Sequence, residues 1–201
     1  MELEQLKDMM KIILKPSRYL HSIGVEEVSC DLACIYGYDT EKASIAGILH
    51  DCAKCLTDEQ LVEECHRFQL PVKEVELGNK QLLHAKVGAV YVKHHYGIVD
   101  EDIINAIYYH TTGRPAMSLL EKIIYIADYI EPYRKPLQGM EKIRSTAYED
   151  IDLAVFMIAE SVLNYLQHTG ALIDTLTVET YEYYETVIKN REMKEVCYGQ
   201  F

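Results

Sequence analysis

Six histidine and aspartate side chains in this sequence could together bind metal ions. They are His21, His50, Asp51, His84, His110 and Asp128. His50 and Asp51 are adjacent in the run Ile48–Lys54, and the other four fall in separate segments, near an expected helix end or on an inward helix face. Imidazole and carboxylate donors without a thiolate suit iron, manganese, cobalt or zinc. The set predicts a metal centre of the catalytic type, with coordination positions left open for water and substrate.

Asp51 is the natural bridging ligand of a two-metal site, because each of its carboxylate oxygens can bind one ion. One metal is expected to be held by His21, His50 and Asp128, and the other by His84 and His110. A hydroxide between two metals about 3.5–4 Å apart is a nucleophile near neutral pH and suits attack on phosphorus. We therefore predict catalytic roles for His50, Asp51 and Lys54, since Lys54 follows His50 by one helical turn and can reach a bound phosphate.

The other histidines and the cysteines are expected to be structural. A single histidine on an apolar face is more often a core or surface residue than a ligand. Ordinary polar surroundings are predicted for His66, His94, His95 and His168. Cys52 and Cys55 form a CxxC pair, which could indicate zinc or redox chemistry, but no second pair completes a four-sulfur set. All six cysteines are therefore predicted to be reduced.

Apolar residues recur at helical spacing along the chain, and no segment shows the alternation of a strand. The predicted class is all-α, with one domain over residues 1–201. Within it, a metal-site core is expected at about 16–135, with C-terminal helices at about 149–194 packing on it. Helices are predicted over 1–14, 16–36, 41–54, 57–68, 82–96, 101–110, 118–131, 149–168 and 178–194, with one or two helical turns over 72–77. The predicted helix 41–54 carries His50 and Asp51 near its end. The helix over 149–168 is expected to bury Leu153, Phe156, Met157, Leu163 and Leu166.

Composition excludes several classes of function. The formal net charge is −12 without a basic stripe, which argues against binding a long nucleic acid. No apolar run is long enough to span a bilayer, and the acidic, amphipathic N-terminus is unlike a signal peptide. A cytoplasmic protein acting on a small molecule is expected, with local cations and metals to neutralise a polyphosphate.

Four segments of the chain resemble the YqeK family of bacterial HD-domain hydrolases, which cleave diadenosine tetraphosphate symmetrically into two ADP. They are the runs Leu49–Lys54 (LHDCAK), His84–Ala89 (HAKVGA), His110–Arg114 (HTTGR) and Tyr125–Arg134 (YIADYIEPYR). An HD pair alone is common among phosphohydrolases, whereas the last two segments together are far more discriminating. The resemblance runs from about Arg18 to the final helix and implies an HD-domain helical bundle.

The resemblance implies an iron-type centre at the six residues named above and nucleotide contacts from Arg18, Lys54, Thr111 and Arg134. Thr111, Thr112 and Gly113 offer hydroxyl and backbone N–H donors for a phosphate or base, and Arg134 could bind a phosphate through two hydrogen bonds. The alternative is that Arg18 and Arg134 are surface charges and Lys54 is a cation at a helix C-terminus. We expect Arg18, Lys54 and Arg134 to set which phosphate lies over the metals.

These observations predict metal-dependent hydrolysis of diadenosine tetraphosphate, or of a related dinucleoside tetraphosphate, to two ADP. Iron is the expected metal, as one ion or two, with manganese, cobalt or zinc as substitutes. Three alternatives share the same ligands. They are an HD phosphohydrolase for a mononucleotide or another alarmone, a di-iron enzyme that activates oxygen, and a non-catalytic sensor that binds ADP. A homodimer is compatible with the sequence, which does not otherwise reveal the oligomeric state.

Overall fold

The computed structural model describes residues 2–137 and 139–198, and side chains as far as residue 194. These residues form eleven α-helices and one 3-10 helix, and none of them lies in a strand, so the all-α prediction is confirmed. The helices are α1 (Leu3–Ile13), α2 (Pro16–Tyr36), α3 (Thr40–Leu49), α4 (Asp58–Arg67), α5 (Glu74–Gly78), η1 (Lys80–Leu82), α6 (Leu83–His94), α7 (Glu101–Tyr109), α8 (Leu119–Ile130), α9 (Met140–Ala147), α10 (Ile151–Thr169) and α11 (Thr175–Tyr198).

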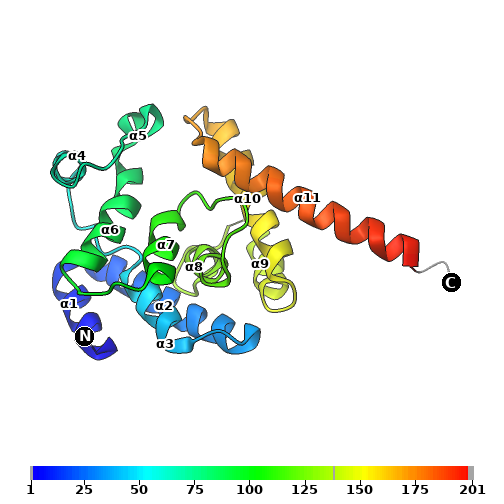
Figure 1. Ribbon diagram of the computed structural model, residues 1–201, viewed down its shortest axis with the longest axis horizontal. Coiled ribbons are helices and arrows are strands. Elements are labelled where there is room, and N and C mark those ends of the chain that lie inside the picture. Colours follow the sequence, from blue (N-terminus) through cyan, green and yellow to red (C-terminus); the bar gives the residue numbers. More distant parts are fainter. Residues whose placement is uncertain (1, 138, 199–201) are drawn as a thin grey trace.

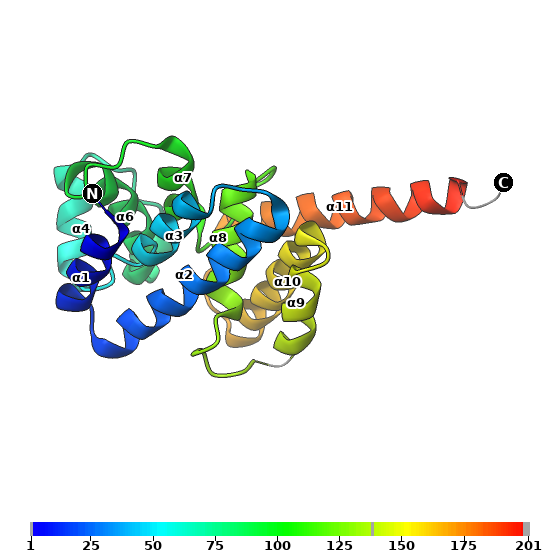
Figure 2. The same ribbon diagram turned by 90° about the horizontal axis from the view of Figure 1, so that it is seen from below.

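The helices that carry the six candidate ligands are packed against one another. Helix α2 lies along α3 and α8, while α7 packs on α3, α6 and α8 (Figures 1 and 2). Pro16 occupies the first turn of α2, where its missing N–H costs nothing, and Asp39 and Asp100 cap α3 and α7 through their carboxylates. The buried core beneath these helices fixes their relative positions, and with them the ligands that they carry.

Helix α3 ends at Leu49, so the prediction that this helix continues to Lys54 was wrong. His50 and Asp51 lie in the tight turn that follows, where Cys52 N–H donates to the Leu49 carbonyl at 2.9 Å and Lys54 N–H to the Asp51 carbonyl at 2.9 Å. These are bonds across three residues rather than four, and they tighten the chain at the end of a helix. In this turn the adjacent side chains of His50 and Asp51 can face the same point, whereas in a regular helix they would point in different directions around the axis.

The C-terminal part differs most from the sequence prediction. Helix α9 was not predicted, and α10 begins at Ile151 because Asp150 caps it by accepting the N–H groups of Asp152 and Leu153. The buried face of α10 consists of Ile151, Ala154, Val155, Ile158, Ala159 and Leu163. Of the predicted stripe, Leu163 is buried as expected, whereas Leu153, Phe156, Met157 and Leu166 are half-buried beside this face.

Helix α11 packs along α10 over its first turns and then extends away from the rest of the molecule (Figures 1 and 2). It begins at Thr175, three residues earlier than predicted. Across the part of the chain that the structure describes, we find no helix with both the length and the apolar character required to traverse a bilayer.

Candidate metal centre and adjoining cavity

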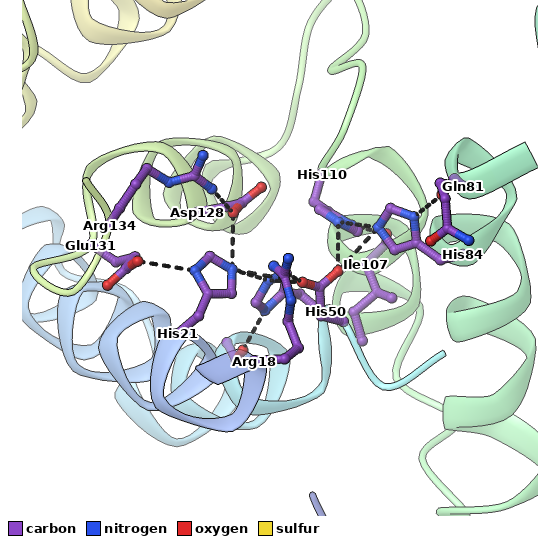
Figure 3. A network of polar contacts seen from close by, with 12 residues as sticks. Arg18, His21, His50, Gln81, His84, Ile107, His110, Asp128, Glu131 and Arg134 are labelled. Carbon is purple, nitrogen blue, oxygen red and sulfur yellow. Dashed lines mark hydrogen bonds and ion pairs between the residues drawn. The ribbon is translucent and has the colours of Figure 1, made fainter. Parts of the chain in front are cut away.

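Four imidazole rings converge at the junction of α2, α6, α7 and the turn after α3. The Nε2 atoms of His21 and His50 are 3.1 Å apart, and those of His84 and His110 are 3.0 Å apart. All four histidines are buried. Figure 3 shows these rings gathered between the helices, with Asp128 beside His21. The fold thus brings together ligand candidates that are up to 107 residues apart in sequence, counted from His21 to Asp128.

Asp51 lies between the two histidine pairs. Its Oδ2 is 3.6 Å from His21 Nε2 and 3.3 Å from His50 Nε2, and its Oδ1 is 3.0 Å from His84 Nε2 and 3.6 Å from His110 Nε2. One carboxylate oxygen therefore faces each pair, which is the arrangement that a bridging ligand needs. Asp128 Oδ1 is 3.2 Å from His21 Nε2 and adds a second carboxylate beside the His21–His50 pair.

The Nδ1 atom of each ring is held by an acceptor outside the cluster. His50, His84 and His110 each donate to the backbone carbonyl three residues earlier, on Gly47, Gln81 and Ile107 respectively. With the proton on Nδ1, each neutral ring presents the bare lone pair of Nε2 to the centre. This is the orientation in which metal-binding histidines are usually fixed by their outer partners.

His21 differs, because its Nδ1 donates to a carboxylate instead. Glu131 Oε1 accepts this hydrogen bond at 3.0 Å, and Glu131 Oε2 accepts the backbone N–H of Tyr133 at 2.6 Å. Glu131 is only 1% exposed. The sequence prediction did not single out this residue. The available signal was its spacing of three residues from Asp128, which places the two side chains on neighbouring positions at the end of α8.

The electrostatics of the centre favour bound positive charge. Burial alone would raise the pKa of Asp51, but the attraction of His50 and the close approach of the His110 and His84 rings hold that pKa well below its usual value. The pKa of Asp128 is likewise lowered: burial opposes this, and His21 and His50 outweigh it. Burial lowers the pKa of His84 to about 4, so this ring is neutral at pH 7 and free to bind a metal. With their lowered pKa values, Asp51 and Asp128 are both ionised at pH 7.

The donor set fits divalent metal ions. Asp51 Oδ1 is buried and accepts no hydrogen bond, although an ionised oxygen without a partner is costly to bury. Three groups of residues bring their ligand atoms within 4.8 Å of one another: His21, His50 and Asp51; His50, His110 and Asp128; and Asp51, His84 and His110. Converging lone pairs and carboxylate oxygens repel one another unless a cation lies between them. A divalent ion of the N/O-binding class satisfies these atoms together.

Three cations surround this centre. Arg18 Nη1 donates to Asp51 Oδ2 at 2.7 Å, and Arg134 Nη2 donates to Asp128 Oδ1 at 2.8 Å. Both arginines are partly exposed, and each is paired with a carboxylate of the centre, Arg18 with the buried Asp51 and Arg134 with the half-buried Asp128. Lys54 is partly buried nearby, and burial lowers its pKa against the attraction of Asp51.

A cavity of about 880 Å³ adjoins the centre on the side of α8, α9 and α10. Two of the candidate ligands, His110 and Asp128, line the cavity at the end that meets the centre, together with Arg134. Farther away the wall is formed by apolar residues such as Ile143 and Met157, together with the aromatic rings of Tyr125, Tyr129 and Tyr165 and the polar groups of Lys142, Ser161 and Asn164. This volume lies within the range of small-molecule sites. The half-burial of Met157 is therefore explained by its position in the cavity wall.

The segment after His110 contributes unequally to this cavity. Thr111 lines it, whereas the Thr112 hydroxyl donates to the Gly113 carbonyl and the Gly113 N–H donates to the Tyr109 carbonyl at 2.8 Å. The expected free donors at Thr112 and Gly113 are thus already paired within the segment. Gly113 has a φ of +63°, a conformation that favours glycine, so its part is to shape the loop.

The remaining histidines and the CxxC pair do not join the centre. His66, His94, His95 and His168 are exposed, as predicted. Cys52 is buried, Cys55 is exposed, and both are free thiols. Cys30, Cys34 and Cys65 are also free, while the side chain of Cys197 lies outside the described residues.

Comparison with known proteins places the chain in a family. Residues 18–133, which include all six candidate ligands, match the HD domain family. A symmetrical bis(5'-nucleosyl)-tetraphosphatase from Halalkalibacterium halodurans is 43% identical over 173 residues, covering 86% of this chain and 91% of that protein. The protein of the same name from Staphylococcus aureus is 36% identical over 192 residues, covering 92% and 95%. The chain belongs to the HD-domain family of symmetrical bis(5'-nucleosyl)-tetraphosphatases.

A solved structure of the HD superfamily supports the same assignment. It is a hydrolase from Clostridium acetobutylicum, described as predicted and as involved in NAD metabolism, which shares 41% identity and superposes with a TM-score of 0.88. The match covers 92% of this chain and 98% of that one. The resemblance based on the four sequence motifs is thereby confirmed, and this member of the tetraphosphatase family keeps the HD-type fold over nearly its whole length.

Proposed function

We propose that this protein hydrolyses diadenosine tetraphosphate, and related dinucleoside tetraphosphates, symmetrically to two ADP in a metal-dependent reaction. The observation that carries the proposal is the cluster of four buried histidines, the buried Asp51 and the half-buried Asp128 at the end of a cavity large enough for a nucleotide. Membership of the tetraphosphatase family supplies the substrate class. In the reaction, the oxygen of water adds to one of the two inner phosphorus atoms. The bond from that phosphorus to the central bridging oxygen breaks, and the other half leaves as ADP.

We assign the metal ligands as His21, His50, Asp51, His84, His110 and Asp128. Asp51 would be shared between two positions, because one oxygen faces each histidine pair. The proposed metal is iron, with manganese, cobalt or zinc as substitutes, since the donor set accepts all four. A cation bound there supplies a Lewis acid and lowers the pKa of water.

The cationic side chains position the polyphosphate in this proposal. Arg18 and Arg134 each lie against a carboxylate of the centre, so their remaining N–H groups are within reach of phosphates bound there. Arg134 also lines the cavity, and its buried Nε atom makes no hydrogen bond to the protein. Lys54 carries its charge beside them, and a nearby phosphate would offset the cost of burying it. These three residues would determine which phosphorus lies at the centre.

The cavity is proposed to hold one nucleoside half of the substrate. Its apolar and tyrosine-lined wall suits a purine and a ribose, and its end at His110 and Asp128 places the phosphates of that half next to the centre. Thr111 lines the same space and would contact the nucleotide. We also propose that the protein acts in the cytoplasm on freely diffusing nucleotides rather than on long nucleic acid, consistent with its net charge of −12.

The test is a product analysis with the purified protein, ferrous iron and diadenosine tetraphosphate under anaerobic conditions. We expect ADP as the only nucleotide product of the wild-type protein, and no ADP from the Asp51→Ala variant. AMP with ATP would show that a different phosphorus lies over the centre. No turnover with iron, manganese, cobalt or zinc would contradict the proposed reaction, and oxygen consumption during turnover would indicate the oxygen-activating class instead.

A further inference from the structure

The first three turns of α11 contact the loop that follows His110. Thr180 is fully buried on α11, and its Oγ1 lies 3.1 Å from the Thr112 carbonyl and 2.6 Å from the Leu176 carbonyl, so these two acceptors share its single hydroxyl proton. One turn later, the hydroxyl of Tyr184 accepts the backbone N–H of Met117 at 3.1 Å. Tyr184 is 1% exposed. The two ends of this loop are therefore both hydrogen-bonded to one helix.

The approach of α11 to this loop depends on a glycine. A Cβ atom at Gly113 would lie 2.8 Å from Cγ2 and 3.0 Å from Oγ1 of Thr180, which is closer than a side chain tolerates. Gly113 also has positive φ, so the position is restricted both by its conformation and by contact with α11. A loop packed so closely cannot move without displacing the helix.

The start of α11 is also tied to the segment that leads to His84. Asp174 caps the helix by accepting the N–H of Leu176, and the same carboxylate accepts two hydrogen bonds from Lys73 Nζ at 2.8 and 3.0 Å. Lys73 immediately precedes α5, which is followed by η1 and by His84 in the first turn of α6. Helix α11 thus joins the chain before His84 to the chain after His110, and these are the two histidines that face Asp51 Oδ1.

We propose that α11 positions the nucleotide-binding side of the centre, with Thr180 and Tyr184 as positioning residues that act through the loop carrying Thr111. The inference rests on the function proposed above, and it assigns to α11 the positioning of a substrate contact in that function. Helix α11 lies outside residues 18–133, which match the HD domain family. Thr111 is the residue through which the loop reaches the cavity, so a loop released from α11 loses a substrate contact.

Thr180→Val and Tyr184→Phe test this role because each removes a hydroxyl and keeps the shape of the side chain. We expect the KM for diadenosine tetraphosphate and the Kd for ADP to rise about fivefold in each variant, the effect of one net hydrogen bond, while kcat changes much less. Amide hydrogen exchange in residues 110–118 should become faster. Thr180→Ser, which retains the hydroxyl, should restore wild-type KM. The matched control is Tyr183→Phe, at the neighbouring and more exposed tyrosine.

The outcomes separate this inference from the proposed function. An unchanged KM and an unchanged Kd for ADP in folded Thr180→Val and Tyr184→Phe would overturn the positioning role. If amide hydrogen exchange in the loop were nevertheless faster, the contact with α11 would only stabilise the fold. A wild-type protein that does not cleave diadenosine tetraphosphate would overturn the proposed reaction. The ADP affinity and the exchange rates would then still decide whether α11 positions a nucleotide site.

Discussion

Glu131→Gln tests whether the carboxylate behind His21 contributes to metal binding. Glu131 accepts two N–H groups at once, from His21 Nδ1 at 3.0 Å and from the Tyr133 backbone at 2.6 Å. Glutamine has the same shape but only one acceptor oxygen, so its NH₂ group must face one of these two donors. The substitution therefore removes a charge and also leaves a buried donor facing another donor.

The magnitude follows from these contacts. A hydrogen bond to a charged group contributes about 1.5–3 kcal/mol, and loss of an outer partner of a metal-binding histidine typically weakens metal affinity about 10- to 100-fold. Because Glu131 is buried, solvent does not screen this effect. We expect a loss of this size in the affinity for Mn²⁺, with a parallel fall in activity at limiting metal that excess metal partly restores.

The assay is a titration of the metal-free protein with Mn²⁺, followed by electron paramagnetic resonance of the free ion, with Glu63→Gln as the control. Glu63 is exposed on α4, so its substitution changes the net charge equally without touching the centre. Circular dichroism confirms that each variant is folded. Equal Mn²⁺ affinity in folded Glu131→Gln and Glu63→Gln would refute the reasoning.

Four further results are expected. Gly24→Ala places a Cβ atom 2.6 Å from Glu131 Oε2, so urea denaturation should show a loss of about 1–3 kcal/mol, whereas Gly88→Ala, with neighbours at 3.5 Å, should not destabilise the protein. Lys54→Met should lower kcat/KM about tenfold or more, because it removes the proposed contact to a phosphate. It should not lower the stability of the protein, because it removes a charge that is costly to bury. Retained activity would exclude a phosphate contact. Burial lowers the pKa of Lys54 in the folded protein, so the folded state releases the Lys54 proton more readily than the unfolded state does. As pH rises toward the pKa of an unfolded lysine, about 10.4, wild type should therefore gain stability relative to Lys54→Met. A stability difference that does not change with pH would contradict this. Chelation should abolish activity and lower the Tm, and both should return when metal is added; an unchanged Tm would mean that the cluster does not bind metal in the purified protein.

Local patterns predicted most of the fold. The apolar periodicity and the capping residues located α2, α4, α7 and α8 to within two residues, because these helices have strong signals at their ends. Helix α9 escaped prediction because it has only eight residues and begins after Gly139 without a side-chain cap. The end of α3 was misplaced because Cys52-Ala53-Lys54 carries no helix-stopping residue, and the packed turn overrides local preference there.

The candidate site was predicted in part. The types and spacing of His21, His50, Asp51, His84, His110 and Asp128 singled them out, and the fold brings all six together. The phosphate contacts of Arg18, Lys54 and Arg134 stay predictions, although all three side chains lie beside the centre. Glu131 and the contact of α11 with the His110 loop were not predicted, because a glutamate and a threonine on a helix face have many ordinary roles.

The sequence by itself determined the chemistry available to this protein: an N/O donor set without thiolates, an all-helical scaffold and membership of a phosphohydrolase family. Those properties depend on residue identity and on spacing within single helices. Only the tertiary structure decided which oxygen of Asp51 faces which histidine pair, which acceptor fixes each Nδ1, and where the cavity lies. These are relations between segments far apart in the chain, such as His21 with Glu131 and Thr112 with Thr180, and they are set by how whole helices pack rather than by any local pattern.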